Sequence, residues 1–378
     1  MSVPEIRGRL AMPFASLIAI IALSIQPSLA QAVKQSECVG RYEFDLPGDV
    51  DVAMLNFDLL AESVVKKFGY RRNGRGYAFP SDAEPRWSGT WGSDQQINDV
   101  LLSGPLMDRE TFFGRFKQAV DKSWHGKQEE LNAFHRKDQA DELRPTTTDL
   151  PDAFAWTWAK SITVYMLRGG RAFTFTGDTS DPSDVDSIQY VSEYLHSRAL
   201  YEIPTESGIC LHYGFLPDGR QHPKGYNIAV TYRLKDHPDV EIFFEDSYAA
   251  NDLKGNSPEE EVNSFWGGGF HGPQKRADKQ RRILNAHIPG VVQFPSVKMG
   301  GYDGKASFVE MDHADGGLDY GYMAYVKGHA EANGYARTIM LYVIRTAARA
   351  KGVPVSKGEL KAMAEGIVAS VRLHPVRP

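Results

Sequence analysis

The residue types best suited to chemistry gather in the acidic run Glu310-Met311-Asp312-His313-Ala314-Asp315. Carboxylates and an imidazole are ligands for divalent cations, so Asp312, His313 and Asp315 form a candidate site for metal-assisted hydrolysis. The run is followed directly by Gly316-Gly317. Asp and Gly are also ordinary turn formers, so a solvated hairpin turn explains the same residues without a metal. We favour the turn and keep a secreted metal-assisted hydrolase as the alternative function.

A second candidate for chemistry is the glycine-rich segment Gly267-Gly268-Gly269-Phe270-His271-Gly272. Loops that cradle a phosphate or an oxyanion join a strand to a helix, whereas we expect no strand directly before this segment and no helix directly after it, so we favour a flexible exposed loop. The chain also lacks the common signatures G-x-S-x-G, H-E-x-x-H, G-x-x-x-x-G-K-[ST] and C-x-x-C. We therefore predict that the protein is not an enzyme and that it uses no cofactor and no metal.

The chain has two cysteines, Cys38 and Cys210, which are too few for a cysteine-rich zinc site. In an oxidising compartment they allow one intramolecular disulfide, which we predict between Cys38 and Cys210. Two buried free thiols that behave as small apolar side chains are the alternative, because sequence spacing says nothing about distance.

The first thirty residues have the pattern of an export signal. Arg7 and Arg9 precede an apolar run over residues 14–23, and Ser28-Leu29-Ala30 supplies a small-residue cleavage site. The run is shorter than the ~20 residues that span a bilayer. We expect residues 1–30 to be a cleaved signal peptide, and the mature protein to be exported without stable membrane insertion. An uncleaved membrane anchor is the alternative.

Length and composition describe a globular protein. The chain has 378 residues, and single cores rarely exceed about 250–300 residues, so two domains are expected. The content of 42% hydrophobic and 24% charged residues excludes a disordered chain. The formal net charge of -5 leaves no basic footprint, so we expect no nucleic-acid partner.

The two cysteines lie in similar segments, residues 38–47 and 208–217, and both segments end in Leu-Pro. Side chains alternate along each segment, so we expect each to be one strand. Two such strands, about half the chain apart, predict two halves that are built alike. We place the N-terminal domain at residues 31–203 and the C-terminal domain at residues 204–378.

Periodicity places the remaining elements between these segments. The helices are expected at residues 51–68, 108–142, 184–198, 275–286 and 355–370, with a further helix beginning near residue 257. The strands are expected at residues 154–158, 162–167, 171–176, 227–232, 240–245, 306–311, 320–326, 336–344 and 371–373. The predicted fold is α+β, with two topologically similar domains that are each a mainly antiparallel sheet packed with helices.

Three tryptophans lie in stretches that contain glycine and show no periodicity. Tryptophan and arginine are common anchors of protein interfaces, so these stretches are predicted to contact a partner. The predicted contact residues are Arg86, Trp87, Trp91, Glu259, Glu260, Trp266 and Phe270. The alternative is that each tryptophan fills the core of its own domain, since large aromatic side chains are usually mostly buried.

The two cysteine segments also carry a family resemblance. Residues 38–47, C-V-G-R-Y-E-F-D-L-P, resemble the opening of the type VI secretion lipase-immunity family, fourth group, and residues 208–215, G-I-C-L-H-Y-G-F, resemble the start of its C-terminal domain. The resemblance implies a two-domain periplasmic immunity protein, monomeric when unbound, that binds and blocks a cognate antibacterial lipase or phospholipase toxin. Such a protein needs a rigid scaffold and no catalytic group. A disulfide would restrict the motion of its domains and reduce the ordering cost of binding.

Overall fold

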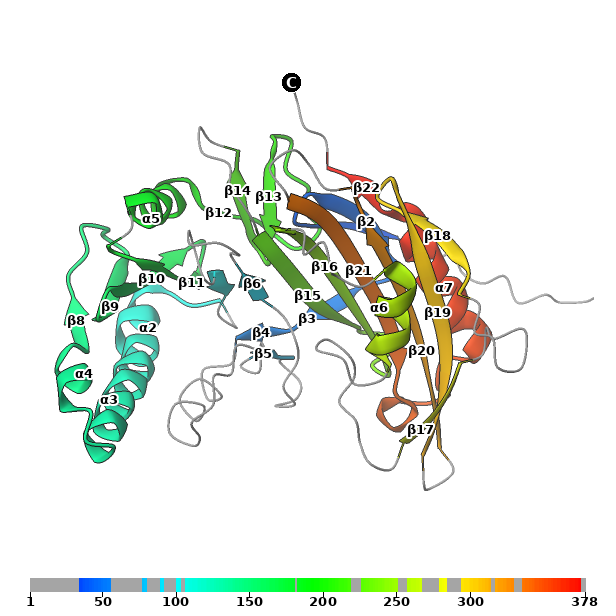
Figure 1. Ribbon diagram of the computed structural model, residues 1–378, viewed down its shortest axis with the longest axis horizontal. Coiled ribbons are helices and arrows are strands. Elements are labelled where there is room, and N and C mark those ends of the chain that lie inside the picture. The colour runs from blue at the N-terminus through cyan, green and yellow to red at the C-terminus, as the bar shows by residue number, and fades with distance from the viewer. Residues whose placement is uncertain are drawn as a thin grey trace, which may run out of the picture. The chain divides into compact units, whose positions relative to one another are not determined.

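The computed structural model describes an α+β protein of antiparallel sheets and short helices, as predicted (Figure 1). The described residues are 34–55, 77–79, 89–91, 100–102, 106–180, 182–218, 226–250, 257–266, 279–283, 294–313, 317–329 and 335–374. The predicted signal peptide and parts of several predicted loops lie outside these residues.

The largest element is a nine-stranded antiparallel sheet with the order β17-β19-β20-β21-β16-β15-β3, in which β18 pairs with β19 and β6 pairs with β15. Its strands are β3 (Val50–Val52), β6 (Gly89–Trp91), β15 (Tyr226–Leu234), β16 (Val240–Ala250), β17 (Lys279–Ile283), β18 (Ser296–Met299), β19 (Tyr302–His313), β20 (Leu318–Lys327) and β21 (Tyr335–Arg345). The strands predicted at residues 227–232, 240–245, 306–311, 320–326 and 336–344 are confirmed.

Both faces of this sheet are apolar, because neighbouring side chains on a strand point to opposite faces. On β16, Ile242 and Phe244 belong to the main core, whereas Phe243 belongs to a second core. The main core is covered by α7 (Lys357–Ser370), and the second is covered by α6 (Pro258–Phe265). The helix signals near residue 257 and at 355–370 are therefore confirmed.

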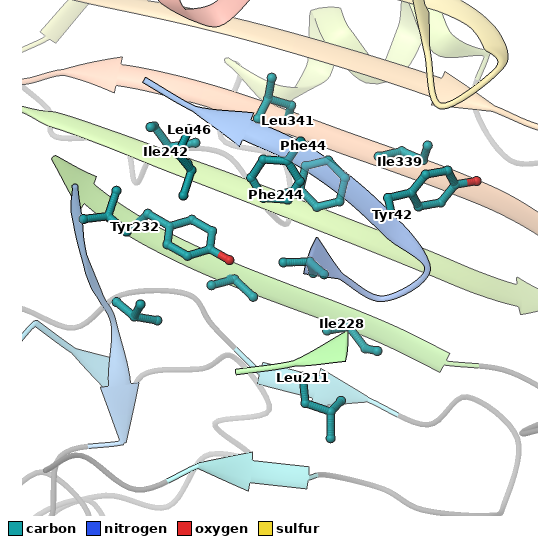
Figure 2. Close-up of a cluster of buried hydrophobic side chains, with 14 of the residues drawn as sticks. Tyr42, Phe44, Leu46, Leu211, Ile228, Tyr232, Ile242, Phe244, Ile339 and Leu341 are labelled. Atoms are coloured by element: carbon teal, nitrogen blue, oxygen red, sulfur yellow. The ribbon is translucent and has the colours of Figure 1, made fainter. Parts of the chain in front are cut away.

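The first cysteine segment is a hairpin and not the single strand that we predicted. β1 (Gln35–Val39) pairs with β2 (Tyr42–Leu46), and β2 pairs with the C-terminal strand β22 (Arg372–Leu373). The turn is possible because Gly40 takes a positive φ of 60°, which glycine tolerates. A side chain at Gly40 would also overlap the carboxylate of Asp246. Figure 2 shows β2 against the large sheet, where Phe44 stacks on Phe244 at 4.4 Å.

The second cysteine segment is also a hairpin, which corrects the same prediction. β13 (Gly208–Leu211) turns through His212 and Tyr213 into β14 (Gly214–Pro217), which also pairs with β12 (His196–Ser197). The φ of Tyr213 is 49°. Alternation alone misled both predictions, because a two-residue turn leaves the apolar pattern running through both strands.

A five-stranded antiparallel sheet, in the order β7-β11-β10-β9-β8, forms the other large element. Its strands are β7 (Val100–Leu102), β8 (Arg144–Thr146), β9 (Ala153–Trp158), β10 (Ser161–Arg168) and β11 (Arg171–Asp178). Its helices are α2 (Arg109–Thr111), η1 (Phe112–Phe116), α3 (Lys117–Ala133), α4 (Lys137–Asp141) and α5 (Pro182–Tyr194). The helical region predicted at 108–142 and the three predicted strands that follow it are confirmed, and the helix predicted at 184–198 is confirmed as far as Tyr194, beyond which His196–Ser197 form β12. Phe112 and Phe116 pack against Phe154 of β9.

Two predicted helices are wrong over the residues that the structure describes. Within 275–286, Lys279–Ile283 form β17, which pairs with β19. Lys, Arg and Gln favour helices only weakly, and pairing with a sheet edge overrides that preference. Within 51–68, the described residues contribute to β3 and to β4 (Met54–Leu55), which pairs with β5 (Tyr77–Ala78).

The sheets cross the predicted domain boundary at residues 203–204. β3 and β6 lie in the nine-stranded sheet, and the C-terminal β22 joins the first hairpin. Contacts group residues 33–378 into one compact unit. The boundary therefore stays a prediction. Within the described part of the chain, no helix is long and apolar enough to cross a bilayer.

Candidate functional site

Helix α6 carries two of the predicted partner contacts, Glu259 and Glu260. The Ser257 hydroxyl accepts a hydrogen bond from the Glu260 N–H at 3.2 Å, and the Glu260 carboxylate accepts one from the Ser257 N–H at 2.7 Å. This capping box lowers the pKa of Glu260, because hydrogen bonds from Ser257 stabilise its charged form. Glu260 thus fixes the start of the helix, while the exposed Glu259 presents its charge to solvent.

Trp266 at the end of α6 lies in the core, which corrects its prediction as a partner contact. Its side chain is 2% exposed, and its indole N–H donates to the Ser307 hydroxyl at 2.7 Å. The ring lies so close to Gly321 of β20 that any side chain there would overlap it. The competing interpretation, a tryptophan that fills its own core, describes this residue correctly. Trp266 attaches α6 to the sheet.

The other predicted contacts are only partly placed by the structure. Trp91 ends β6, where its backbone pairs with Asn227 of β15. Arg86, Trp87 and Phe270 lie outside the described residues. These positions therefore remain predictions.

The acidic run predicted as a turn or a metal site follows the hairpin interpretation. β19 ends at His313, β20 begins at Leu318, and Asp312 pairs with Leu318 across the hairpin. Asp312 is exposed, and Asp315 lies outside the described residues. In the described part of the chain, no group of three His, Cys, Asp or Glu side chains is placed to hold a metal.

The most elaborate polar arrangement surrounds the two cysteines. Cys38 and Cys210 form a disulfide with a Cα–Cα distance of 5.7 Å, and both residues are 0% exposed. Two backbone hydrogen bonds lie beside it, from the Gly40 N–H to the Cys210 carbonyl at 2.9 Å and from the Cys210 N–H to the Gly40 carbonyl at 2.8 Å. The two hairpins are thus joined to each other directly.

Arg198 is the centre of this junction. Its Nη2 donates to the Glu37 carboxylate at 2.5 Å, to the Cys38 carbonyl at 3.0 Å and to the Leu211 carbonyl at 3.1 Å. Its remaining donors reach the carbonyls of Ala199, Glu202 and Gly214. The planar guanidinium presents several donors in a fixed geometry, so one side chain fastens both hairpins and the segment between β12 and β13.

Glu37 completes the pairing of charges in this junction. It is fully buried, and its carboxylate also accepts hydrogen bonds from the Cys38 N–H and the Tyr201 N–H, both at 2.9 Å. A buried carboxylate is tolerated because a cation and several donors surround it. Glu37 was not identified from the sequence as part of a site. An acid beside a buried cysteine was the available signal for a buried partner.

His212 in the β13–β14 turn lies within the same junction and is 5% exposed. Burial, and after it the nearby charge of Arg198, lowers the pKa of His212 to about 3. His212 is therefore a neutral imidazole at physiological pH, so the junction holds one cation, Arg198, opposite one anion, Glu37.

A second buried network fixes the turn of the first hairpin. Asp246 accepts hydrogen bonds from the Arg41 N–H and the Tyr226 hydroxyl, both at 2.9 Å, and from Arg337 at 3.0 Å. The Arg41 side chain in turn binds both carboxylate oxygens of Asp218, at 2.8 and 2.5 Å. Asp218 directly follows β14, so this network also connects the two hairpins.

The C-terminus is attached to the first hairpin by a third set of contacts. Glu43 of β2 meets the Nδ1 atom of His374 at 2.8 Å and the guanidinium of Arg372 at 2.9 Å. The other ring nitrogen of His374 lies 3.0 Å from the carbonyl of Glu206, just before β13. In all three networks the charged side chains pair with each other and hold segments of the protein together, as expected for a rigid scaffold.

Solved structures with this fold are immunity proteins of type VI secretion systems. The immunity protein TplEi from Pseudomonas aeruginosa, complexed with an "L" peptide, is 18% identical, with a TM-score of 0.54 over 92% of this chain and 100% of that chain. The Tli4 complex with Tle4 is 17% identical, with a TM-score of 0.54 over 91% and 98%. The chain thus has the fold of this class.

A family model identifies the group more closely. Residues 202–257 match the model described as the Tle cognate immunity protein 4 C-terminal domain. The resemblance to the type VI secretion lipase-immunity family is thereby confirmed. A comparison with curated protein sequences finds no match.

Proposed function

We propose that this protein is a periplasmic immunity protein that binds and inhibits a cognate type VI secreted lipase or phospholipase toxin. One observation carries the proposal: the immunity-protein fold extends over nine-tenths of the chain, and residues 202–257 match the immunity-domain family. The protein acts by covering the toxin and has no catalytic activity of its own. No observation favours the metal-assisted hydrolase.

The internal pairing of charges supports this mode of action. The buried Arg198, the partly buried Arg337 and their carboxylate partners hold strands together and are not aimed at a substrate. Inhibition then depends on exposed residues carried by a scaffold that is already ordered, which keeps the entropic cost of binding low. Of the predicted contacts whose side chains the structure describes, Glu259 and Glu260 are exposed, and Glu259 is the stronger candidate because the Glu260 carboxylate is used in the capping box. The two predicted domains can contact the toxin from two sides.

The test is a co-purification of the exported protein with a lipase encoded beside it, followed by a phospholipase assay on vesicles. We expect a stable complex and a stoichiometric loss of lipase activity. An unrelated exported lipase serves as the control and should keep its activity. Failure to bind any neighbouring lipase, or turnover of phospholipid by the protein alone, would refute the proposal.

Export is tested separately. We propose cleavage after Ala30, so N-terminal sequencing of periplasmic protein should begin at Gln31. An intact N-terminus in the periplasmic fraction would contradict it.

A further inference from the structure

The disulfide joins two hairpins that share the main core, and one of them also reaches the five-stranded sheet. The hairpin of Cys38 belongs to the core of the nine-stranded sheet, where Phe44 stacks on Phe244 and the Asp45 N–H donates to the Ser370 hydroxyl of α7 at 2.9 Å. The hairpin thus moves with that sheet.

The hairpin of Cys210 shares the main core through Ile209 and Leu211, and it also contacts the five-stranded sheet. The guanidinium of Arg171, at the start of β11, lies 3.7 Å from the ring centroid of Tyr213 in the turn. A side chain at Gly214 would approach the ring of Phe173 to 2.9 Å, so β14 lies directly against β11. Since the chain has two cysteines, their bond is the one disulfide that can link the two sheets.

The noncovalent links between the hairpins depend on this bond for their alignment. Arg198 bridges the hairpins only while the carbonyls of Cys38 and Leu211 both stay within hydrogen-bond distance of its guanidinium. Its ion pair with Glu37 is buried, and buried ion pairs contribute little net stability unless their geometry is exact. Opening the disulfide would leave the Gly40–Cys210 backbone hydrogen bonds, Arg198 and the Arg41–Asp218 pair without a covalent constraint on their alignment.

We propose that the Cys38–Cys210 disulfide is a compartment-dependent lock: the protein reaches its toxin-inhibiting form when this bond closes after export, and chain with reduced cysteines inhibits poorly. The inference rests on the proposed function. Closure forms one S–S bond and breaks two S–H bonds, and the two electrons and two protons pass to the disulfide of an exported thiol oxidase, which becomes a dithiol. A cytosolic copy would thus lack the locked form.

Once formed, the disulfide resists reduction as long as the protein stays folded. Both cysteines are 0% exposed, whereas attack by a thiolate requires access to a sulfur atom. A dithiol reductant reaches the bond only after β1 or β13 opens. We expect dithiothreitol to leave the bond intact in native buffer and to reduce it rapidly in urea, with the dithiothreitol itself oxidised to its cyclic disulfide.

The decisive experiment compares three purified full-length proteins: the oxidised wild type, the double variant Cys38→Ala/Cys210→Ala, and Leu131→Ala. Leu131 is a buried residue of α3, in a small cluster with Ala140 and Leu143, so its truncation lowers the Tm without touching the hairpins. The measurements are the Kd for the toxin and hydrogen exchange over residues 35–46 and 208–217.

We expect the double variant to bind the toxin at least about tenfold more weakly and to exchange faster in both hairpins. Leu131→Ala should bind as the wild type does, despite its lower Tm. Equal Kd values for the wild type and the double variant, or rapid reduction of the native protein, would overturn the lock. If the oxidised wild type fails to bind the toxin, the proposed function is refuted, and so is the claim that the disulfide is needed for inhibition. The reduction and exchange measurements then still decide whether the bond holds the hairpins together.

Discussion

Acidification should weaken the fold through His212. Its folded-state pKa lies at about 3 because the imidazole is buried, whereas the unfolded chain titrates with an ordinary value near 6.5. Below pH 6.5 the unfolded chain takes up a proton that the folded protein excludes. The stability that His212 contributes is therefore complete above pH 6.5 and is lost progressively as the pH falls toward 3.

The size of this loss follows from the interval between the two pKa values. Each pH unit below the unfolded-state pKa of about 6.5 costs about 1.36 kcal/mol of stability. A change from pH 7.5 to pH 5.0 crosses about 1.5 such units and should reduce the free energy of unfolding by about 2 kcal/mol. The loss attributable to His212 would approach about 5 kcal/mol near pH 3. The assay is urea unfolding at pH 7.5, 6.5, 5.5 and 5.0, on the wild type and on His212→Gln.

The variant separates His212 from the carboxylates that also titrate on acidification. His212→Gln should be less stable than the wild type at pH 7.5, but it should lose about 2 kcal/mol less between pH 7.5 and pH 5.0. His196→Gln replaces an exposed imidazole on β12 and should retain the wild-type pH dependence. Parallel pH profiles for the wild type and His212→Gln, or an NMR titration of His212 with a midpoint near 6.5, would refute the reasoning.

Three further substitutions test the junction, the second core and the predicted contact surface. Arg198→Met should lower the free energy of unfolding by about 3–5 kcal/mol, because it leaves the Glu37 charge buried and unpaired, and adding Glu37→Gln should restore part of the loss in urea unfolding. Trp266→Ala should cost about 3–5 kcal/mol through the cavity beneath α6. The affinity of the folded Trp266→Ala variant for the toxin should stay unchanged. A large loss of affinity would indicate that Trp266 contacts the toxin after all. Glu259→Lys should weaken toxin binding by more than about 1 kcal/mol, whereas Glu129→Lys, the same charge change on exposed α3, should not; equal effects would remove Glu259 from the contact surface.

Strands with strict alternation could be predicted because burial on a sheet face has a period of two. β10 and β11 are examples, and the Gly169-Gly170 turn between them supplied a strong local signal. The same rule failed at Gly40, because alternation does not show where a chain reverses. It also failed for β17, whose charged residues become a strand only through pairing with β19.

The candidate site was less accessible to prediction. The Glu37–Arg198 pair joins residues 161 positions apart, and nothing in either local sequence selects the other. Trp266 was predicted as an anchor because its flanking glycines suggested an exposed loop, but Gly321 provides the space that buries it. The pairing of the cysteines was suggested by their number and by the signal peptide. Their position between two hairpins required coordinates.

The pairing of β22 with β2 has a consequence for the order of folding. Residues 372–374 bind the first hairpin through strand pairing, through the bond from the His374 N–H to the Arg41 carbonyl at 2.7 Å, and through Glu43. One strand of this three-stranded sheet is therefore supplied from far along the sequence. The sheet can be completed only after residues 372–373 have been synthesised, so it forms late compared with hairpins whose strands are adjacent in sequence.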